Sequence, residues 1–253
     1  MTGSLSVGIA AAAGTAVAEA IGPALERGGF HALWVNDTPG ADALEVLAAA
    51  ARVTDRLVLA TGVIPVDRRA PHEILTRVET LGLPLDRLVL GIGAGGIRVG
   101  ALDRVRDAAV SLRAGTTARV VVGALGPKMR RLGVEAADGL LLSWLTPDMA
   151  AEQADHAHGV DPTAHVALYV RAATDPEAAA RLHEEAARYG SYPAYAANFA
   201  RLGITAAETI IEPGAGRARI DAYRAGVDEV VLRAITTGDL PEDYIRFIDA
   251  VTP

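Results

Sequence analysis

The sequence contains the apolar run Leu57-Val58-Leu59-Ala60-Thr61-Gly62-Val63, which decides the fold together with Leu88-Val89-Leu90-Gly91-Ile92. Both runs are short and continuously apolar, which is typical of parallel strands covered on two faces. Residues 71–81 between them have the apolar spacing of a helix and begin with a proline, which suits a first turn. These stretches predict one β/α unit followed by the strand of the next.

The same alternation continues from one end of the chain to the other. Strands are predicted at residues 5–10, 32–35, 57–63, 88–92, 119–122, 139–142, 166–170 and 229–232. Helices are predicted at residues 16–28, 41–52, 71–81, 102–114, 127–135, 147–158, 176 to about 202, and 241–251. Eight such units without a linker predict an α/β fold, a single (β/α)8 TIM barrel with shortened insertions over residues 1–253. A doubly wound open sheet is the alternative, although it usually has fewer strands at this length.

Composition excludes several classes of protein. The chain has 253 residues, 51% apolar and 22% charged, a formal net charge of −7 and no cysteine. The absence of cysteine excludes disulfides, thiolate metal sites and cysteine nucleophiles. The acidic balance argues against a nucleic-acid partner, because such a protein needs a basic face.

Targeting signals are not evident either. The Ala- and Gly-rich start has no Lys or Arg before its apolar part, and no apolar run approaches the roughly 20 residues of a membrane helix. We therefore expect a cytoplasmic protein with no membrane partner.

In a β/α barrel the chemistry lies at the carboxyl ends of the strands. The candidates at these ends are Asn36, Asp37, residues 62–69, 93–98 and 123–127, Ser143, Trp144, Arg171 and Arg233. Residues 91–96 match the dinucleotide pattern G-x-G-x-x-G, but three β/α units precede them and no acidic residue ends the next strand, so a Rossmann site is not predicted. Residues 123–128 lead from a strand into a helix, whose free N–H groups favour a phosphate, and Lys128 adds charge.

Histidine and serine offer less chemistry. The six histidines lie on helices or before strands, and none has the spacing of a metal site such as H-E-x-x-H. No G-x-S-x-G nucleophile motif is present. No metal site and no serine nucleophile are therefore predicted, and the catalytic residues remain unassigned.

Several strand-end motifs resemble the bacterial luciferase-like monooxygenase superfamily, in particular its branch that uses the deazaflavin coenzyme F420 and includes methylene-tetrahydromethanopterin reductase. The resemblance rests on residues 122–129 and 136–147, with support from residues 32–37, 59–63, 90–95 and 228–232. The combination is specific, whereas each motif alone is not. The family fold is a β/α barrel, in agreement with the strand count.

The resemblance implies a cofactor that lies across the strand ends, coenzyme F420 or, as the alternative, FMN. The segment matching Thr61, Gly62 and Val63 is implied to carry a bulge, often with a non-proline cis peptide, behind the cofactor ring. The other implied cofactor-binding residues are Asp37 at the end of the second strand, Gly91, Gly93 and Gly95 near the cofactor tail, and Ala124, Gly126 and Pro127 in the phosphate loop. Trp144, Arg171 and Arg233 are the candidates for binding a small-molecule substrate.

The chain also departs from the family pattern. Thr38 stands where many members have a histidine, and Gly96 and Ile97 stand where members that oxidise sugar phosphates have a glutamate. The family's usual insertion after the fourth helix is short here, which leaves the site more open or leaves it to a partner subunit to close.

These observations favour an F420-dependent oxidoreductase. The alternatives are an FMN-dependent monooxygenase served by a separate flavin reductase, and a non-catalytic barrel that binds a ligand or a protein. Members of the family are commonly dimers, so a homodimer is the expected assembly.

Overall fold

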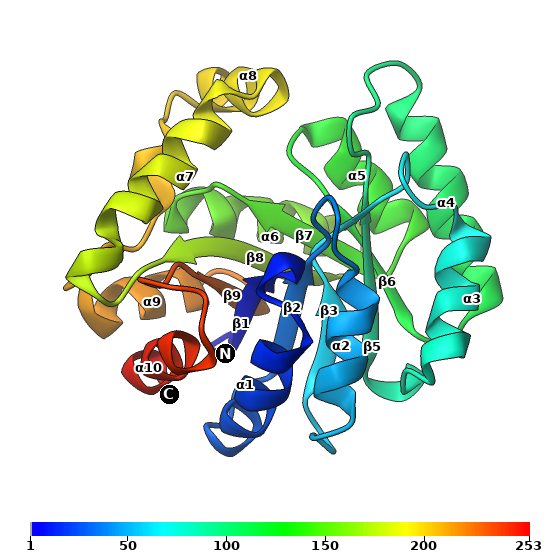
Figure 1. The fold of residues 1–253 in the computed structure, drawn as a ribbon. Coiled ribbons are helices and arrows are strands. Elements are labelled where there is room, and N and C mark those ends of the chain that lie inside the picture. The colour runs from blue at the N-terminus through cyan, green and yellow to red at the C-terminus, as the bar shows by residue number, and fades with distance from the viewer. Residues whose placement is uncertain (1) are drawn as a thin grey trace.

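A closed parallel barrel forms the centre of the molecule (Figure 1). The structure is a computed structural model and describes residues 2–253. The strands are β1 (Ser4–Ala10), β2 (Ala32–Asn36), β3 (Val58–Thr61), β4 (Ile64–Pro65), β5 (Leu88–Gly93), β6 (Arg119–Gly123), β7 (Gly139–Ser143), β8 (His165–Ala172) and β9 (Glu229–Ala234). The sheet order is β3-β2-β1-β9-β8-β7-β6-β5-β4, and the pairing of β3 with β5 closes it. Because β3 and β4 are two parts of one barrel strand, the predicted (β/α)8 barrel is confirmed and the open sheet is excluded.

Helices surround this barrel (Figure 1). They are α1 (Thr15–Arg27), α2 (Ala43–Ala51), α3 (Pro71–Leu81), α4 (Ala101–Gly115), α5 (Pro127–Ala136), α6 (Pro147–Val160), α7 (Ala179–Ser191), α8 (Pro193–Leu202), α9 (Gly216–Arg224) and α10 (Pro241–Val251). Short 3-10 helices are η1 (Ala11–Ala13), η2 (Leu85–Arg87), η3 (Pro176–Ala178) and η4 (Ala206–Thr209). Within residues 2–253, no helix combines the length and the apolar composition needed to cross a membrane.

The helices between β8 and β9 differ from the prediction. The single helical stretch expected from residue 176 to about 202 is broken at Tyr192, whose backbone is extended (φ −74°, ψ 128°). Pro193 explains the break, because proline lacks an N–H and disfavours the helical conformation in the residue before it. The helix α9 was not predicted, since its sequence begins in the glycine-rich segment Gly214–Gly216 and is strongly polar.

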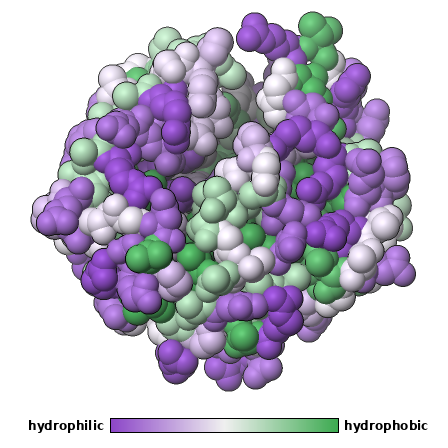
Figure 2. Space-filling view, viewed as in Figure 1, coloured by the Kyte–Doolittle hydropathy of each residue, from purple (hydrophilic) through white to green (hydrophobic). Residues whose placement is uncertain are grey.

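The predicted short connection after α4 is present. The helix ends at Gly115 and β6 begins at Arg119. In the space-filling view the surface is hollowed between α8 and the side of the molecule that carries α4 and α5 (Figure 2). This connection joins the end of a helix to the start of a strand, so it lies at the amino ends of the barrel strands and its length does not determine how far their carboxyl ends are covered.

The barrel interior holds one charged side chain near the amino ends of the strands. Glu229 on β9 is 2% exposed, and its carboxylate accepts hydrogen bonds from Ser6 Oγ, from Trp34 Nε1 at 2.6 Å and from His165 Nε2 at 2.8 Å. Burial raises the pKa of Glu229, but the bond and charge of His165, the charge of His31 and the bond from Ser6 outweigh it and hold the pKa below 4.5. The carboxylate is thus charged at neutral pH and joins β1, β2 and β8 to β9.

Glu229→Gln is expected to lower the free energy of unfolding by about 3 kcal/mol at neutral pH, because it removes a buried carboxylate that accepts hydrogen bonds from Ser6, Trp34 and His165. A group whose pKa is lowered by folding stabilises the protein above its unfolded pKa, and this stabilisation is lost as the pH falls through the folded value. The difference between wild type and E229Q should therefore shrink below about pH 4.5. Urea unfolding followed by tryptophan fluorescence over a pH series measures it. The exposed Glu242→Gln is the control, and a difference that persists unchanged into acid would contradict the assignment.

Candidate active site

A cleft of about 430 Å³ opens at the carboxyl ends of the barrel strands. Its walls come from β2, the β3–β4 segment, β5, β6, β7, β8 and the start of α8. Seven of the predicted cofactor-binding residues line the cleft. Six come from strand ends and loops, and the seventh is the acidic residue after β2. They are Gly62, Val63, Gly93, Gly95, Ala124, Gly126 and Asp37. The structure therefore brings residues from distant parts of the sequence to one surface, as the barrel predicts.

Gly62 and Val63 form the centre of the cleft floor. The peptide bond between them is cis, which is the feature that the resemblance implied for this segment. Gly62 N donates to Val35 O at 2.8 Å, and Gly62 O accepts from Asn36 Nδ2. Beneath Gly62 lies the ring of Trp34, so that a Cβ at Gly62 would lie 3.2 Å from it. The barrel core thus supports the floor directly.

Tyr169 fixes Asn36 from the opposite side of the barrel. Its hydroxyl donates to Asn36 Oδ1, and the side chain is 2% exposed. Burial raises the pKa of Tyr169 well above its usual value, so the hydroxyl keeps its proton. The sequence alone does not single out Tyr169, because it lies inside an apolar strand. The glycine at position 8, inside a strand, was a usable signal of a large side chain packed against it, since a Cβ there would lie 2.4 Å from the Tyr169 hydroxyl oxygen.

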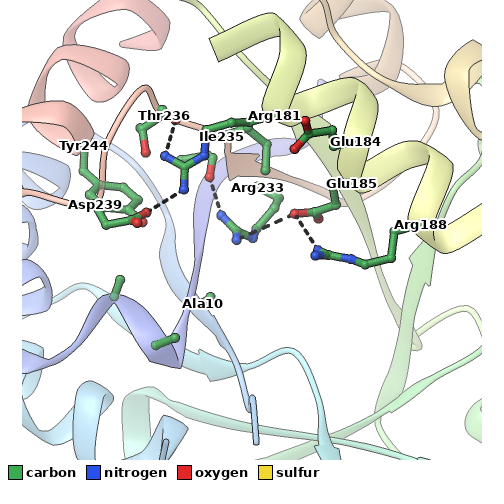
Figure 3. Close-up of a pocket in the computed structure, with 13 residues that line it drawn as sticks. Ala10, Arg181, Glu184, Glu185, Arg188, Arg233, Ile235, Thr236, Asp239 and Tyr244 are labelled. Carbon is green, nitrogen blue, oxygen red and sulfur yellow. Dashed lines mark hydrogen bonds and ion pairs between the residues drawn. The ribbon is translucent and has the colours of Figure 1, made fainter.

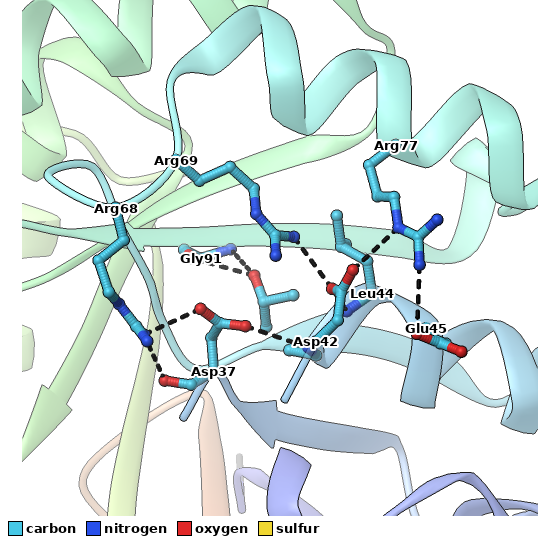
Figure 4. Close-up of polar contacts among 10 residues, drawn as sticks. Asp37, Asp42, Leu44, Glu45, Arg68, Arg69, Arg77 and Gly91 are labelled. Atoms are coloured by element: carbon cyan, nitrogen blue, oxygen red, sulfur yellow. Dashed lines mark hydrogen bonds and ion pairs between the residues drawn. The ribbon is translucent and has the colours of Figure 1, made fainter. Parts of the chain in front are cut away.

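Thr61 and Gly91 lie beneath the cleft and do not line it. Thr61 Oγ1 donates to Gly91 O and accepts from Gly91 N, each at 2.9 Å (Figure 4). A Cβ at Gly91 would lie 2.0 Å from the carbonyl oxygen of Thr61, so the two strands approach too closely for a side chain. These two residues hold β3 against β5 and stay predictions as cofactor contacts.

The glycine loop after β5 is held by Asp67. Gly96 N donates to Asp67 Oδ2 at 2.7 Å. Gly95 has φ +60°, and a Cβ on it would lie 2.0 Å from Asp67 Oδ1. The glycines of this loop therefore allow the Asp67 carboxylate to lie close to the backbone.

Asp37 lines the cleft, but both of its carboxylate oxygens have partners in the protein. Oδ1 accepts from Ala43 N at 3.1 Å, and Oδ2 accepts from Arg68 Nη2 at 2.9 Å (Figure 4). Next to it, Asp42 pairs with Arg69 at 3.0 Å and with Arg77 at 2.9 Å. These ion pairs tie the loop after β4 to the loop after β2, so Arg68 and Arg69 hold loops in place.

The N-terminus of α5 forms the far end of the cleft. Gly126 is the residue before the helix, and a Cβ on it would meet no atom within 4 Å. Pro127 begins the helix without lining the cleft, and the N–H groups of Lys128 and Met129 lie in the unpaired first turn. This end is suited to an anionic group.

Arg171 is a deeply buried cation of the cleft, with a side chain that is 5% exposed. Its guanidinium donates to Ser143 Oγ and, at 3.2 Å, to Glu185 Oε1. Its central carbon lies 4.0 Å from the centre of the Trp144 ring and 4.7 Å from that of Tyr189. Aromatic faces attract such a cation, so Arg171 is firmly positioned.

Trp144 and Arg233 do not line this cleft. Trp144 is 1% exposed, has φ 59°, and packs beneath Arg171 and against Phe199. Arg233 lies in a second cavity beneath α7. Of the three candidate substrate-binding residues, only Arg171 faces the cleft.

An aromatic wall completes the site. Tyr189 and Tyr195 line the cleft, and their ring centres lie 4.9 Å apart. Burial raises the pKa of Tyr195 to about 12. Within residues 2–253, His, Asp and Glu side chains nowhere gather as a group of three that could hold a metal ion.

Residues 6–102 match the sequence model of the luciferase-like monooxygenases. This match confirms the resemblance over the motifs at residues 32–37, 59–63 and 90–95, whereas the motifs at residues 122–129 and 136–147 lie outside it. No curated protein sequence matches the chain.

Solved structures of oxidoreductases share the whole fold. An F420-dependent secondary alcohol dehydrogenase in complex with an F420–acetone adduct is 17% identical, with a TM-score of 0.73 and 100% of each chain covered. The coenzyme F420-dependent tetrahydromethanopterin reductase from Methanopyrus kandleri is 18% identical, with a TM-score of 0.71 and 99% of each chain covered. The oxygenating constituent of 3,6-diketocamphane monooxygenase from Pseudomonas putida, in complex with FMN, is 15% identical, with a TM-score of 0.62 and 96% of this chain and 95% of that chain covered.

Gly91→Ala is expected to destabilise the protein by about 3 kcal/mol, because its Cβ would overlap the Thr61 carbonyl oxygen and force β3 and β5 apart. Gly159→Ala on α6 is the matched control, since a Cβ there meets no atom within 4 Å. Thermal unfolding of both variants measures the difference. Equal stability of G91A and wild type would contradict the close packing described for this pair of strands.

Proposed function

We propose that the chain is an oxidoreductase that binds coenzyme F420 in the strand-end cleft and uses it to transfer a hydride to or from a small organic substrate. One observation carries the proposal: a single cleft joins a smooth floor around Gly62 to the helix N-terminus at Gly126. This arrangement offers a surface for a flat ring at one end and donors for a phosphate at the other. The match of residues 6–102 to the luciferase-like monooxygenases supports it.

The residues present fit the ring of a deazaflavin. The cleft lining includes the apolar side chains of Val63, Leu141 and Met129, and a volume of about 430 Å³ is in the usual range for ligand pockets. Tyr189 and Tyr195 add aromatic surface. Most of the polar groups near the floor are already bonded within the protein, so the floor itself is largely apolar.

The start of α5 fits the phosphate of the cofactor. Gly126 leaves the approach to the helix open, and the N–H groups of Lys128 and Met129 point out of the helix start. Arg130 donates to Leu125 O at 2.8 Å, which fixes the loop before the helix. These residues would hold the phosphate by backbone donors and the partial charge of the helix.

When bound, the coenzyme supplies a ring carbon that accepts or donates a hydride. The chain's own residues bind and orient. Arg171 is a permanent cation that contacts Ser143 at the edge of the cleft and can donate to a carbonyl or anionic oxygen. Tyr195 keeps its proton at neutral pH, because burial raises its pKa to about 12.

FMN is the second candidate cofactor. The FMN-bound diketocamphane monooxygenase has the same fold as the two F420-dependent structures, so the fold itself does not distinguish the two cofactors. A homodimer, a separate flavin reductase and a cytoplasmic location stay predictions.

We expect the purified protein to bind coenzyme F420 more tightly than FMN. Fluorescence polarisation of each cofactor, titrated with protein under the same conditions, measures both affinities. Binding of FMN alone would replace the proposal by the FMN-dependent alternative. Binding of neither would overturn both and leave the barrel as a binding protein without this cofactor.

Gly126→Ala is expected to weaken cofactor affinity about tenfold, because a methyl group would stand between the phosphate and the helix N–H groups. Its thermal stability should match that of wild type, since the backbone at Gly126 (φ −91°) suits any residue and the Cβ meets no atom. Gly159→Ala is again the control. Unchanged cofactor affinity in G126A would place the phosphate elsewhere.

A further inference from the structure

A second cavity of about 310 Å³ lies beside the cleft, between the carboxyl ends of β1 and β9 and helix α7. Its lining includes Ala10 from β1, Arg233 from β9, and Arg181, Glu185 and Arg188 from one face of α7 (Figure 3). The cofactor cleft does not use any of these residues. The cavity therefore needs its own explanation.

Buried positive charge exceeds buried negative charge around Glu185, which lines this cavity. Arg171 and Arg233, with side chains 5% and 14% exposed, share the carboxylate of Glu185, which is 13% exposed. The exposed Arg188 approaches the same carboxylate at 3.7 Å. Burial raises the pKa of Glu185, but the charges of Arg233 and Arg171 outweigh it and hold the pKa below its usual value. One buried anion thus serves two buried cations, and an uncompensated buried charge is costly.

The surplus charge falls on Arg233. Arg171 is satisfied by Ser143, by Glu185 at 3.2 Å and by the ring of Trp144. Arg233 Nη2, by contrast, lies 4.0 Å from Glu185 Oε2, beyond hydrogen-bond distance. Of its five N–H donors, the described residues engage one, which bonds to Ala234 O.

Other acidic groups on the cavity do not remove this surplus. Asp239 is 68% exposed and pairs with Arg181 at 3.0 Å, and Glu184 is exposed to solvent. Water and salt screen such exposed charges. Tyr244 also lines the cavity, and burial raises its pKa, so that it adds no negative charge at neutral pH.

We propose that this cavity binds the phosphate or carboxylate group of an organic anion, with Arg233 as the residue that contacts it. Arginine offers paired donors that match the oxygens of either group. Glu185 lines the cavity and bonds to Arg171, which lines the cofactor cleft, so the anion is held one side-chain pair away from the cleft. That the anion is the substrate rests on the proposed oxidoreductase function, whereas anion binding itself can be measured without any cofactor.

The test is thermal unfolding of the cofactor-free protein in inorganic phosphate, in acetate, and in sodium chloride at equal ionic strength. A ligand that binds the folded state raises the unfolding temperature with its concentration. We expect phosphate or acetate to stabilise the wild type more than chloride does, and the anion whose advantage over chloride is lost in Arg233→Gln identifies the anionic group, because phosphate also stabilises folded proteins in general and can bind at the start of α5. No stabilisation beyond that of chloride by either anion overturns the proposal.

Two variants at the site are expected to respond in opposite directions. Arg233→Gln removes the contacting cation and should weaken anion affinity about tenfold or more. Glu185→Gln removes the competing carboxylate, so it should unfold at a lower temperature in chloride and be stabilised by the anion more than wild type is. The exposed Arg52→Gln, taken from a surface ion pair far from the cavity, should respond as wild type does.

Either variant alone can contradict the proposal, so the test remains decisive if one of them does not fold. Equal stabilisation of R233Q and wild type by the anion overturns the proposal, and so does a Glu185→Gln variant that the anion stabilises less than it does wild type. Because no cofactor is present in these measurements, a failure here is distinct from a failure to bind coenzyme F420.

Discussion

The buried carboxylate of Glu229 is the interaction on which the barrel interior depends. It is held by Ser6 on β1, Trp34 on β2 and His165 on β8, so one charge joins four neighbouring strands. A buried charge is tolerated only when such partners surround it. The hydrogen bond from Trp34 Nε1 to the carboxylate also fixes the orientation of the Trp34 ring. The Trp34 ring in turn lies directly beneath Gly62. A charge at one end of the barrel therefore positions the floor of the cleft at the other.

Above Trp34, large and small residues alternate across the barrel. Gly8 leaves the space that Tyr169 fills, and Tyr169 reaches Asn36, which holds the carbonyl of Gly62. Each of these contacts joins residues more than twenty positions apart. The result is a rigid floor whose polar groups are satisfied inside the protein, which leaves the exposed surface smooth enough for a flat ligand.

The strands were predictable because continuous apolar runs are local signals, and closure of the barrel followed from their number. The parts that were not predictable depend on distant partners. Nothing near Arg171 or Arg233 in the sequence indicates that both approach Glu185 on α7. Nor does it indicate that Arg171 lines the cleft whereas Arg233 lines the second cavity. Likewise Gly91 matched a cofactor motif, although its close approach to Thr61 explains the glycine without any ligand. The motifs located the strand ends correctly, whereas the role of each residue became evident only from the side chains and backbone packed against it.

Glu185 makes the cleft and the cavity electrostatically interdependent. Its two oxygens face different cations, Oε1 toward Arg171 at 3.2 Å and Oε2 toward Arg233 at 4.0 Å. An anion bound at Arg233 would leave more of the carboxylate's charge to Arg171 and so weaken the positive field at the edge of the cleft. By thermodynamic reciprocity, a negatively charged group beside Arg171 would weaken anion binding at Arg233 to the same degree. The shared carboxylate therefore favours one bound anion at a time, either at Arg233 or beside Arg171.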